Sequence, residues 1–168
     1  LTFRNLYSHL ASHYDEIIAV HLTGKFSGTY FNSLKAAEKI SLEFNKRIAV
    51  IDSRNVSGGL GLISLRIAKS IEEGKKFDQI VADADKWIRE TKIYVSVRTL
   101  KYMVRGGRVS PFKGFMAKLL NVNPIVSMDE EGNSMVFDKA YSQKANMEKV
   151  MKHVRKNLEG KEIWNYIV

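Results

Sequence analysis

Two kinds of apolar pattern alternate along the first half of the chain, and this alternation restricts the fold more than any other feature. Two short runs rich in Ile, Val and Ala, Glu16–Leu22 and Arg47–Ile51, are typical of buried β-strands. Stripes of helical period surround them, and the predicted helices are Thr2–Tyr14, Ser27–Asn45, a segment that begins at Ser57, and Asp78–Glu90. Strands that alternate with helices form βαβ units, so the sequence predicts an α/β domain with a parallel sheet.

The pattern changes after Thr91, where shorter elements and a hairpin signal follow. The elements predicted there are a strand at Ile93–Val97, a basic helical piece with a break at Gly106–Gly107, a helix at Lys113–Leu120, strands at Pro124–Met128 and Ser134–Lys139, a helix at Gln143–Leu158 and a last strand at Ile163–Val168. The turn residues Asp129–Asn133 favour antiparallel or mixed pairing. We therefore predict a parallel α/β portion over residues 1–92 and a smaller α/β portion over residues 93–168.

The composition excludes several classes of protein. The chain has no cysteine, which excludes disulfides, thiol catalysis and thiolate metal sites. It has no apolar run long enough to span a membrane and no signal-like N-terminus, so we expect a cytoplasmic protein. His9 and His13 are four residues apart on a predicted helix, but nothing nearby completes a ligand set, so we expect no metal site.

The net charge of +9 is concentrated in one segment, between Glu90 and Asp129, which contains no acidic residue. Its seven basic residues are Lys92, Arg98, Lys101, Arg105, Arg108, Lys113 and Lys118. Aromatic residues lie among them, namely Tyr94, Tyr102 and Phe112, and this mixture can bind RNA by stacking and charge. Four residues have instead the pattern of core positions, which makes the basic residues a solvated face: Leu100, Tyr102, Met103 and Val104. Nucleic-acid binding is therefore our second hypothesis.

A turn rich in small and hydroxyl residues, Thr23–Tyr30, joins the first predicted strand to the next helix. The first turn of a helix has backbone N–H groups without partners and the positive end of the helix dipole, so it can hold an anion. Ser27 can be a simple N-cap, or Thr23 and Gly24 can complete a site for a carboxylate or phosphate. The residue order differs from that of a phosphate loop, which disfavours binding of nucleoside triphosphates.

A second turn, which begins at Asp52–Ser53, follows the second predicted strand. Asp52 can be catalytic or can cap the turn, and the turn interpretation is favoured because strand ends commonly carry Asp and Ser. The glycines of Ser57–Gly61 lack the dinucleotide-binding order. His21 is expected to be a buried, hydrogen-bonded imidazole. A hydrolase-like enzyme is the third hypothesis, because the sequence alone supports no Ser-His-Asp arrangement.

Four blocks of the sequence, in their order and spacing, resemble the DegV family of bacterial fatty-acid-binding proteins. The blocks are Thr23–Tyr30, Val50–Ser53 with Gly59–Gly61, Thr99–Met103 with Gly106–Ser110, and Leu119–Ile125 with Glu131–Gly132. The family's upstream Thr-Ser-Gln segment and its C-terminal His-x-Gly-x-Gly segment are missing. Since the first residue is Leu, we interpret the chain as a central fragment of such a protein.

The resemblance implies a carrier and not an enzyme. Such proteins bury a long-chain fatty acid between two α/β domains and present its carboxylate to a separate fatty-acid kinase, with no cofactor beyond the bound fatty acid. The residues that the resemblance places at the carboxylate are Thr23, Gly24, Ser27, Gly28 and Thr29. Ser53 and Arg108 are candidate contacts of the ligand or of the partner.

Four apolar side chains are candidate lining for the acyl chain: Met103, Phe115, Met116 and Leu119. Two departures from the family pattern concern the site. Gly24 stands where the family usually has a second Ser, and Tyr141 stands in place of a frequent basic residue. In a fragment, apolar surfaces left exposed can also drive self-association into a homo-oligomer.

Overall fold

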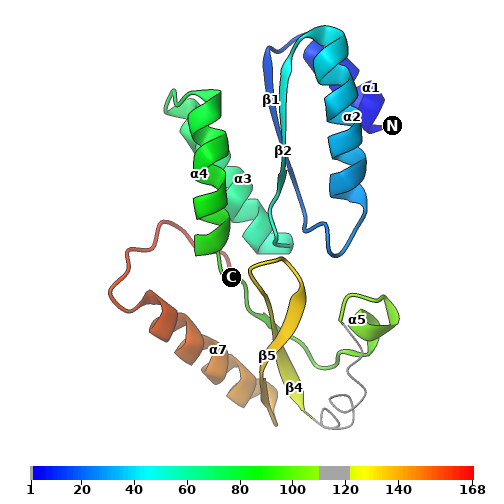
Figure 1. Cartoon of the computed structure of the whole chain (residues 1–168). Helices are drawn as coiled ribbons and strands as arrows, with labels where there is room; N and C mark the ends of the chain where they lie inside the picture. The colour runs from blue at the N-terminus through cyan, green and yellow to red at the C-terminus, as the bar shows by residue number, and fades with distance from the viewer. Residues whose placement is uncertain (1, 110–121) are drawn as a thin grey trace. The chain divides into compact units, whose positions relative to one another are not determined.

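The computed structural model describes residues 2–109 and 122–168. The chain divides into two compact units, Leu1–Thr91 and Lys92–Val168. The elements of the first unit are α1 (Phe3–Ala11), β1 (Glu16–His21), α2 (Thr29–Phe44), β2 (Arg47–Asp52), α3 (Ser57–Glu72) and α4 (Phe77–Glu90) (Figure 1). Those of the second are β3 (Val95–Ser96), α5 (Lys101–Arg105), β4 (Asn123–Met128), β5 (Ser134–Ala140) and α7 (Gln143–Leu158).

In the first unit, β1 and β2 pair in parallel, from Glu16 opposite Arg47 to His21 opposite Asp52. Alternate side chains of a strand point to opposite faces of the sheet, and two apolar clusters use this alternation. On one face Ile17, Ala19, Ile48 and Val50 pack with Tyr7, Ala11, Ala37 and Ile40 of α1 and α2. On the other, Ile18, Val20 and Ile51 pack with Ile63, Ile67, Ile80, Ala84, Trp87 and Ile88 of α3 and α4. The sheet is thus covered by helices on both faces.

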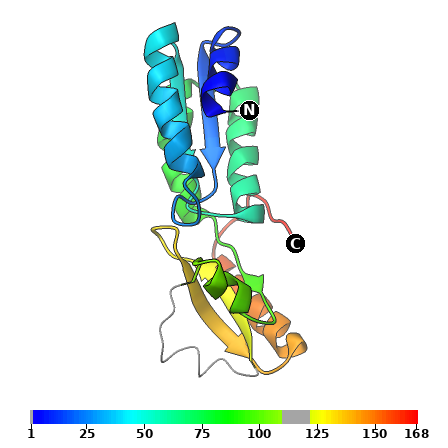
Figure 2. The same cartoon turned by 90° about the vertical axis from the view of Figure 1, so that its right-hand side faces the viewer.

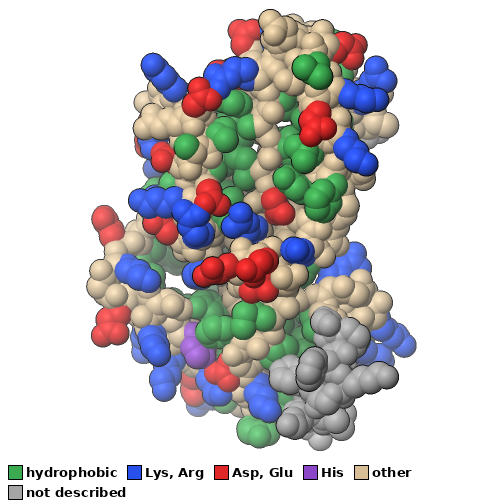
Figure 3. All heavy atoms as spheres, viewed as in Figure 1, with side chains coloured by type: hydrophobic (Ala, Val, Ile, Leu, Met, Phe, Trp, Pro, Cys, Tyr) green, Lys and Arg blue, Asp and Glu red, His purple; other side chains and the backbone are tan. Residues whose placement is uncertain are grey.

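The cover is incomplete on the α3–α4 face. Figure 3 shows hydrophobic side chains on the surface of the first unit between α4 and β2. Ile18 and Val20, which pack against the core on this face, are only partly buried. Part of the apolar surface of the sheet therefore remains accessible to solvent.

In the second unit, β3, β4 and β5 form an antiparallel sheet in that order. The turn between β4 and β5 is closed by Asp129, whose carboxylate accepts hydrogen bonds from the N–H groups of Glu131 and Asn133 at 3.1 and 2.8 Å. Gly132 has a φ of 85°, a conformation that glycine adopts without strain. Figure 2 shows α7 along one face of the sheet, and α7 begins where the Ser142 hydroxyl accepts from the N–H of Ala145.

The pairing of β4 with β5 contains a register shift that matters for the contacts of α7. Ile125 lies opposite Asp138 and Val126 lies opposite Val136, so Phe137 is an extra residue in β5. Such a bulge locally disturbs the alternation of side chains. It explains why the neighbouring residues Phe137 and Asp138 both contact His153 of α7.

The α/β class and the mixture of a parallel with an antiparallel sheet confirm the predicted fold class. The helix predicted over Gln143–Leu158 has those bounds, but the strand predicted over Ile93–Val97 is reduced to Val95–Ser96. The helix predicted over Lys113–Leu120 falls outside the described residues. Among the helices that the structure describes, none has the length and apolarity that a membrane crossing requires.

Two predictions about particular residues are wrong. Residues 163–168 are exposed and have no regular structure, because no described strand provides the backbone partners that a β-strand needs. Tyr102 is 72% exposed, although its pattern suggested a core position. Helix α5 turns about 100° per residue, so Leu100 and Val104 lie on one face and Tyr102 lies on the other. Leu100 is buried as expected, and Met103 and Val104 are half-buried.

Candidate functional site

The loop between β1 and α2, residues 22–28, lies at the carboxyl end of β1, which is where parallel sheets bind ligands. Thr23 holds the first half of this loop together. Its N–H donates to the carbonyl of Asn55 at 2.9 Å, its carbonyl accepts from Phe26 N–H at 3.0 Å, and its hydroxyl accepts from Lys25 N–H at 3.2 Å. Thr23 has no solvent-exposed surface. Its hydroxyl therefore supports the loop from inside.

Asp52, the last residue of β2, ties the same loop to the neighbouring strand. Its Oδ2 accepts a hydrogen bond from Gly24 N–H at 3.0 Å, and its Oδ1 accepts from Arg54 N–H at 2.8 Å. A Cβ at position 24 would lie 3.1 Å from this Oδ2 and equally close to the ring of Phe31. Glycine allows this close approach. The Gly24 amide is thereby already engaged by a carboxylate of the protein.

Ser27 and Thr29 form the accessible part of the loop. Their hydroxyl oxygens are 2.7 Å apart, and the Ser27 Oγ also accepts from Thr29 N–H at 3.2 Å. The N-cap of α2 is Gly28, which has no side chain to cap the helix. Ser27 and Thr29 are both partly exposed, and Gly28 is exposed. Two partly exposed hydroxyl residues thus lie together at the start of a 16-residue helix.

Ser53 lies in the turn that follows β2 and is fully buried. Its N–H donates to the His21 carbonyl at 3.0 Å, and its hydroxyl exchanges hydrogen bonds with the backbone of Asn55. The hydroxyl is therefore used within its own turn. Two backbone hydrogen bonds, in addition to the Asp52 carboxylate, join this turn to the end of β1 and to the β1–α2 loop.

Behind the loop, a row of hydrogen-bonded polar groups links three elements, with Tyr7 and Ser33 buried and His21 only half-buried, although the sequence predicted a buried imidazole. His21 Nε2 lies 2.6 Å from Ser33 Oγ, which lies 2.5 Å from the Tyr7 hydroxyl. Burial raises the pKa of Tyr7, while burial lowers the pKa of His21 against the opposing attraction of Asp52. The sequence predicted a hydrogen-bonded His21, but neither its partner Ser33 nor the contact of Ser33 with Tyr7 was foreseen. A signal was present, since Ser33 interrupts the apolar stripe of α2 on the side of Ala37 and Ile40.

A sequence model of the family described as "Uncharacterised protein, DegV family" matches residues 1–168. The chain belongs to the DegV family. A DegV domain-containing protein of Clostridium acetobutylicum is 36% identical over 163 residues, which are 95% of this chain and 57% of that protein. A second relative, from Clostridium perfringens, is 30% identical over 167 residues and is covered to 59%.

Solved structures of DegV proteins have the same fold. One, described as showing the fatty-acid binding of a DegV family protein from Thermus thermophilus, is 30% identical with a TM-score of 0.84, covering 94% of this chain and 55% of that one. Another, a DegV family protein from Eubacterium eligens loaded with heptadecanoic acid, is 25% identical with a TM-score of 0.80, covering 92% and 56%. The chain therefore spans little more than half the length of the DegV proteins that it matches.

The other candidate residues of this DegV chain lie in the second unit. Met103 is half-buried, and Arg108 is exposed with its Nη1 donating to the Gly106 carbonyl at 2.7 Å. Further basic residues of the predicted patch that are exposed are Lys92, Arg98, Lys101 and Arg105. The candidates Phe115, Met116, Leu119, Lys113 and Lys118 lie outside the described residues. In the described ranges, no group of three or more His, Cys, Asp or Glu side chains is arranged to hold a metal ion.

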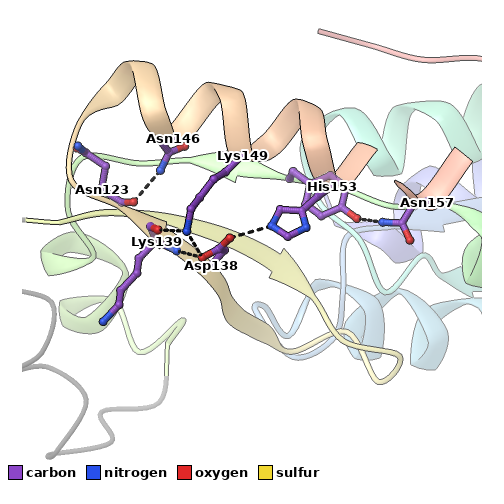
Figure 4. Close-up of polar contacts among 8 residues, drawn as sticks. Asn123, Asp138, Lys139, Asn146, Lys149, His153 and Asn157 are labelled. Carbon is purple, nitrogen blue, oxygen red and sulfur yellow. Dashed lines mark hydrogen bonds and ion pairs between the residues drawn. The ribbon is translucent and has the colours of Figure 1, made fainter. Parts of the chain in front are cut away.

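A polar cluster that sequence reasoning missed joins β5 to α7 (Figure 4). Asp138 accepts from Lys149 Nζ at 2.9 Å through Oδ1 and lies 2.8 Å from His153 Nε2 through Oδ2. Lys149 also donates to the Lys139 carbonyl at 2.8 Å. Asp138 and His153 are separated by 15 residues, so the chain fold and not local spacing brings them together. The cluster fixes the side of α7 against the edge strand.

The Asp138 carboxylate gives the second unit an expected acid sensitivity. Partial burial raises its pKa, but hydrogen bonds from His153, Lys149 and the Lys139 amide outweigh this and lower the pKa from 3.8 to about 2. A lowered pKa stabilises the fold above the unfolded value, and the contribution is lost as the pH falls toward the folded value. We expect the free energy of unfolding of the second unit to fall by about 1 kcal/mol between about pH 4 and pH 2. The effect is no larger because Asp138 and its partners are only partly shielded from water.

Urea unfolding followed by amide hydrogen exchange in α7 checks this expectation at several acidic pH values. The matched control is Asp138→Asn, which has no carboxylate to titrate and should show a flatter pH dependence over the same range. Equal pH dependence in the two proteins would contradict the assignment.

Proposed function

We propose that this chain supplies the carboxylate-binding part of a DegV protein that carries a long-chain fatty acid. The observation that carries the proposal is the partly exposed pair of neighbouring hydroxyls, Ser27 and Thr29, at the start of α2. It is supported by the DegV structures from Thermus thermophilus and Eubacterium eligens, whose descriptions name fatty-acid binding and heptadecanoic acid.

The chemistry of this position suits a carboxylate. The positive end of the dipole of α2 favours an anion, and hydroxyls donate hydrogen bonds to its oxygens. Burial of an acyl chain contributes about 0.8 kcal/mol per methylene group, so most of the affinity would come from the chain and the hydroxyls would fix its direction. Met103, Phe115, Met116 and Leu119 stay our proposal for that lining.

The geometry divides the proposed carboxylate residues into two groups. Ser27, Gly28 and Thr29 are accessible and would contact the ligand. Thr23 is buried, and the Gly24 amide already donates to Asp52. In this proposal Thr23 and Gly24, with the buried Ser53, hold the loop in shape for the other three.

The same proposal makes the protein a carrier and not a catalyst, with the fatty acid as its only bound group. The exposed acidic end of the ligand would be presented to a separate fatty-acid kinase, and the exposed Arg108 is a candidate contact for ligand or kinase. The resemblance to the family supports this role. Formation of acyl phosphate by a purified kinase, dependent on the loaded protein, would test it.

We expect Ser27→Ala to weaken palmitate binding about ten- to a hundredfold, because a hydrogen bond to a charged group contributes about 1.5–3 kcal/mol. Isothermal titration calorimetry with palmitate below its aggregation concentration measures the effect. The matched control is Ser64→Ala, which removes a hydroxyl that donates to the Leu60 carbonyl within α3. Equal affinity of Ser27→Ala and the unchanged protein would contradict the proposed contact, and absence of fatty acid in native mass spectrometry would contradict the carrier function.

Nucleic-acid binding is the second candidate function, and one observation favours it. Tyr102 is 72% exposed beside the exposed basic residues Lys101 and Arg105, so an aromatic ring is available for stacking on a base. Retention on immobilised single-stranded RNA that falls steeply with salt would support this candidate. Weak retention that is insensitive to Tyr102→Ala would count against it.

A further inference from the structure

The hydrogen-bond chain behind the loop closes the base of the loop. His21 is the last residue of β1, and Ser33 lies one helical turn after Thr29, the first residue of α2. The 2.6 Å contact between His21 Nε2 and Ser33 Oγ therefore joins the two ends of the segment that contains residues 22–28. Tyr7 extends the chain to α1 through its 2.5 Å contact with the same Ser33 oxygen.

The hydrogen bonds that join Tyr7, Ser33 and His21 all run in one direction, because each hydroxyl has a single proton to donate. A serine hydroxyl has one proton, so Ser33 can donate to one neighbour while it accepts from the other. When His21 is neutral, its Nε2 can accept from Ser33, and Ser33 accepts from the Tyr7 hydroxyl. The His21 Nε2, the Ser33 hydroxyl and the Tyr7 hydroxyl are then all satisfied, and the ring proton of His21 is on Nδ1.

Protonation of His21 reverses this direction. Nε2–H then donates to Ser33, and the Ser33 proton has to turn to the Tyr7 oxygen. The proton of Tyr7 is left pointing away from Ser33, which is its one hydrogen-bond partner among the described residues. Tyr7 is 2% exposed and Ser33 is fully buried, so water cannot easily replace the lost acceptor.

The groups around His21 come from each element packed against it. The ring of Phe3 in α1 meets the imidazole edge to face, with 5.4 Å between ring centroids, and gives no polar partner. Asp52 of β2 lies opposite His21 in the register and favours the protonated ring by its charge. Both Asp52 oxygens accept from backbone amides, of Gly24 and Arg54.

We infer that Tyr7, Ser33 and His21 form a proton-sensitive clamp on the loop between β1 and α2. With His21 neutral the clamp is closed, and with His21 protonated the contact between the end of β1 and α2 loosens. The loop exposes Ser27 and Thr29, so an open clamp reduces affinity for a carboxylate ligand. Only this last consequence rests on the proposed function.

Nuclear magnetic resonance of the histidine rings tests the clamp directly. In the unchanged protein we expect neutral His21 to carry its proton on Nδ1. Tyr7→Phe keeps the ring packing but removes the proton that loses its acceptor, so His21 should titrate about half a pH unit higher, a change of about threefold in its proton affinity. A neutral His21 with its proton on Nε2, or an unchanged His21 titration in Tyr7→Phe, overturns the inference.

Amide hydrogen exchange of residues 24–29, corrected for its intrinsic pH dependence, tests the coupling to the loop. We expect protection to fall about threefold or more as His21 is protonated, and Ser33→Ala to remove this pH dependence. If Ser33→Ala does not fold, Tyr7→Phe decides, since without the Tyr7 proton the protonation of His21 should no longer lower the protection of residues 24–29. If the protection of residues 24–29 in the unchanged protein does not change over the pH range in which His21 titrates, the coupling is overturned.

Palmitate affinity, measured above and below the pH at which His21 is found to titrate, separates this inference from the proposed function. Weaker binding at the lower pH, tracking the His21 titration, supports both. A protein that shows the ring titration and loop response but binds no palmitate at either pH supports the clamp and contradicts the carrier function.

Discussion

Trp87→Ala is expected to lower the free energy of unfolding of the first unit by about 3–5 kcal/mol, which is a large part of the stability of a domain of this size. Trp87 is 4% exposed in the cluster that joins α3 and α4 to the sheet. The Arg66 guanidinium and the Lys75 ammonium also lie 5.2 and 5.6 Å from the centre of its ring system. Truncation would leave a cavity in the cluster and leave both cations without their aromatic surface.

Urea unfolding with amide exchange read separately for each unit measures this loss. The control is Leu42→Ala, because Leu42 is 86% exposed on α2 and its truncation should change stability by less than about 0.5 kcal/mol. Protection in α7 should be the same in all three proteins if the units unfold separately. A loss below about 1 kcal/mol for Trp87→Ala would contradict the packing described for this cluster.

Asp52→Ala is expected to have the second largest effect, about 2–3 kcal/mol on the first unit, because it removes two hydrogen bonds in which a charged oxygen accepts from a backbone amide. Exchange should increase most at the amides of Gly24 and Arg54. The pKa of His21 should fall further, since Asp52 is the charge that raises it against the effect of burial. Urea unfolding and the histidine titration measure the two effects.

Two variants test whether the effect belongs to the Asp52 contacts. Asp52→Asn keeps an oxygen acceptor and should lose about half as much stability. Asp83→Ala removes a carboxylate that pairs with Lys75 at 3.6 Å on the surface, and such pairs contribute little. If Asp83→Ala lowered the free energy of unfolding as much as Asp52→Ala, the specific role of Asp52 in holding the loop would be refuted.

Much of the fold was predictable because it is periodic. The alternation of strand and helix placed β1, α2, β2, α3 and α4, and the apolar spacing of Gln143–Leu158 gave the bounds of α7. The strand-like composition of Ile163–Val168 was not enough to predict a strand correctly. A β-strand also needs a neighbouring strand to hydrogen-bond with, and no described strand pairs with these residues. Tyr102 was misplaced because five helical residues are too few to show a periodic face.

The candidate site was predictable as a location but not in its internal roles. The sequence indicates a hydroxyl-rich turn after β1, and the structure has that loop at the carboxyl end of the strand. The contacts that hold it join residues far apart in the chain: Gly24 and Asp52 are 28 positions apart, and Tyr7 and Ser33 are 26. No local pattern reports such pairs. Only the interruption of an apolar stripe by Ser33 gave a hint of the second.

The two hydrogen bonds of the Asp52 carboxylate couple the β1–α2 loop to the turn that follows β2. The carboxylate accepts hydrogen bonds from the amides of Gly24 and Arg54. Backbone hydrogen bonds also join Thr23 to Asn55, and Ser53 to His21 at the end of β1. Neither turn can swing without straining its neighbour, so the pair should fluctuate as one cooperative unit. A substitution made in either segment to alter ligand selectivity would then change the conformation of both.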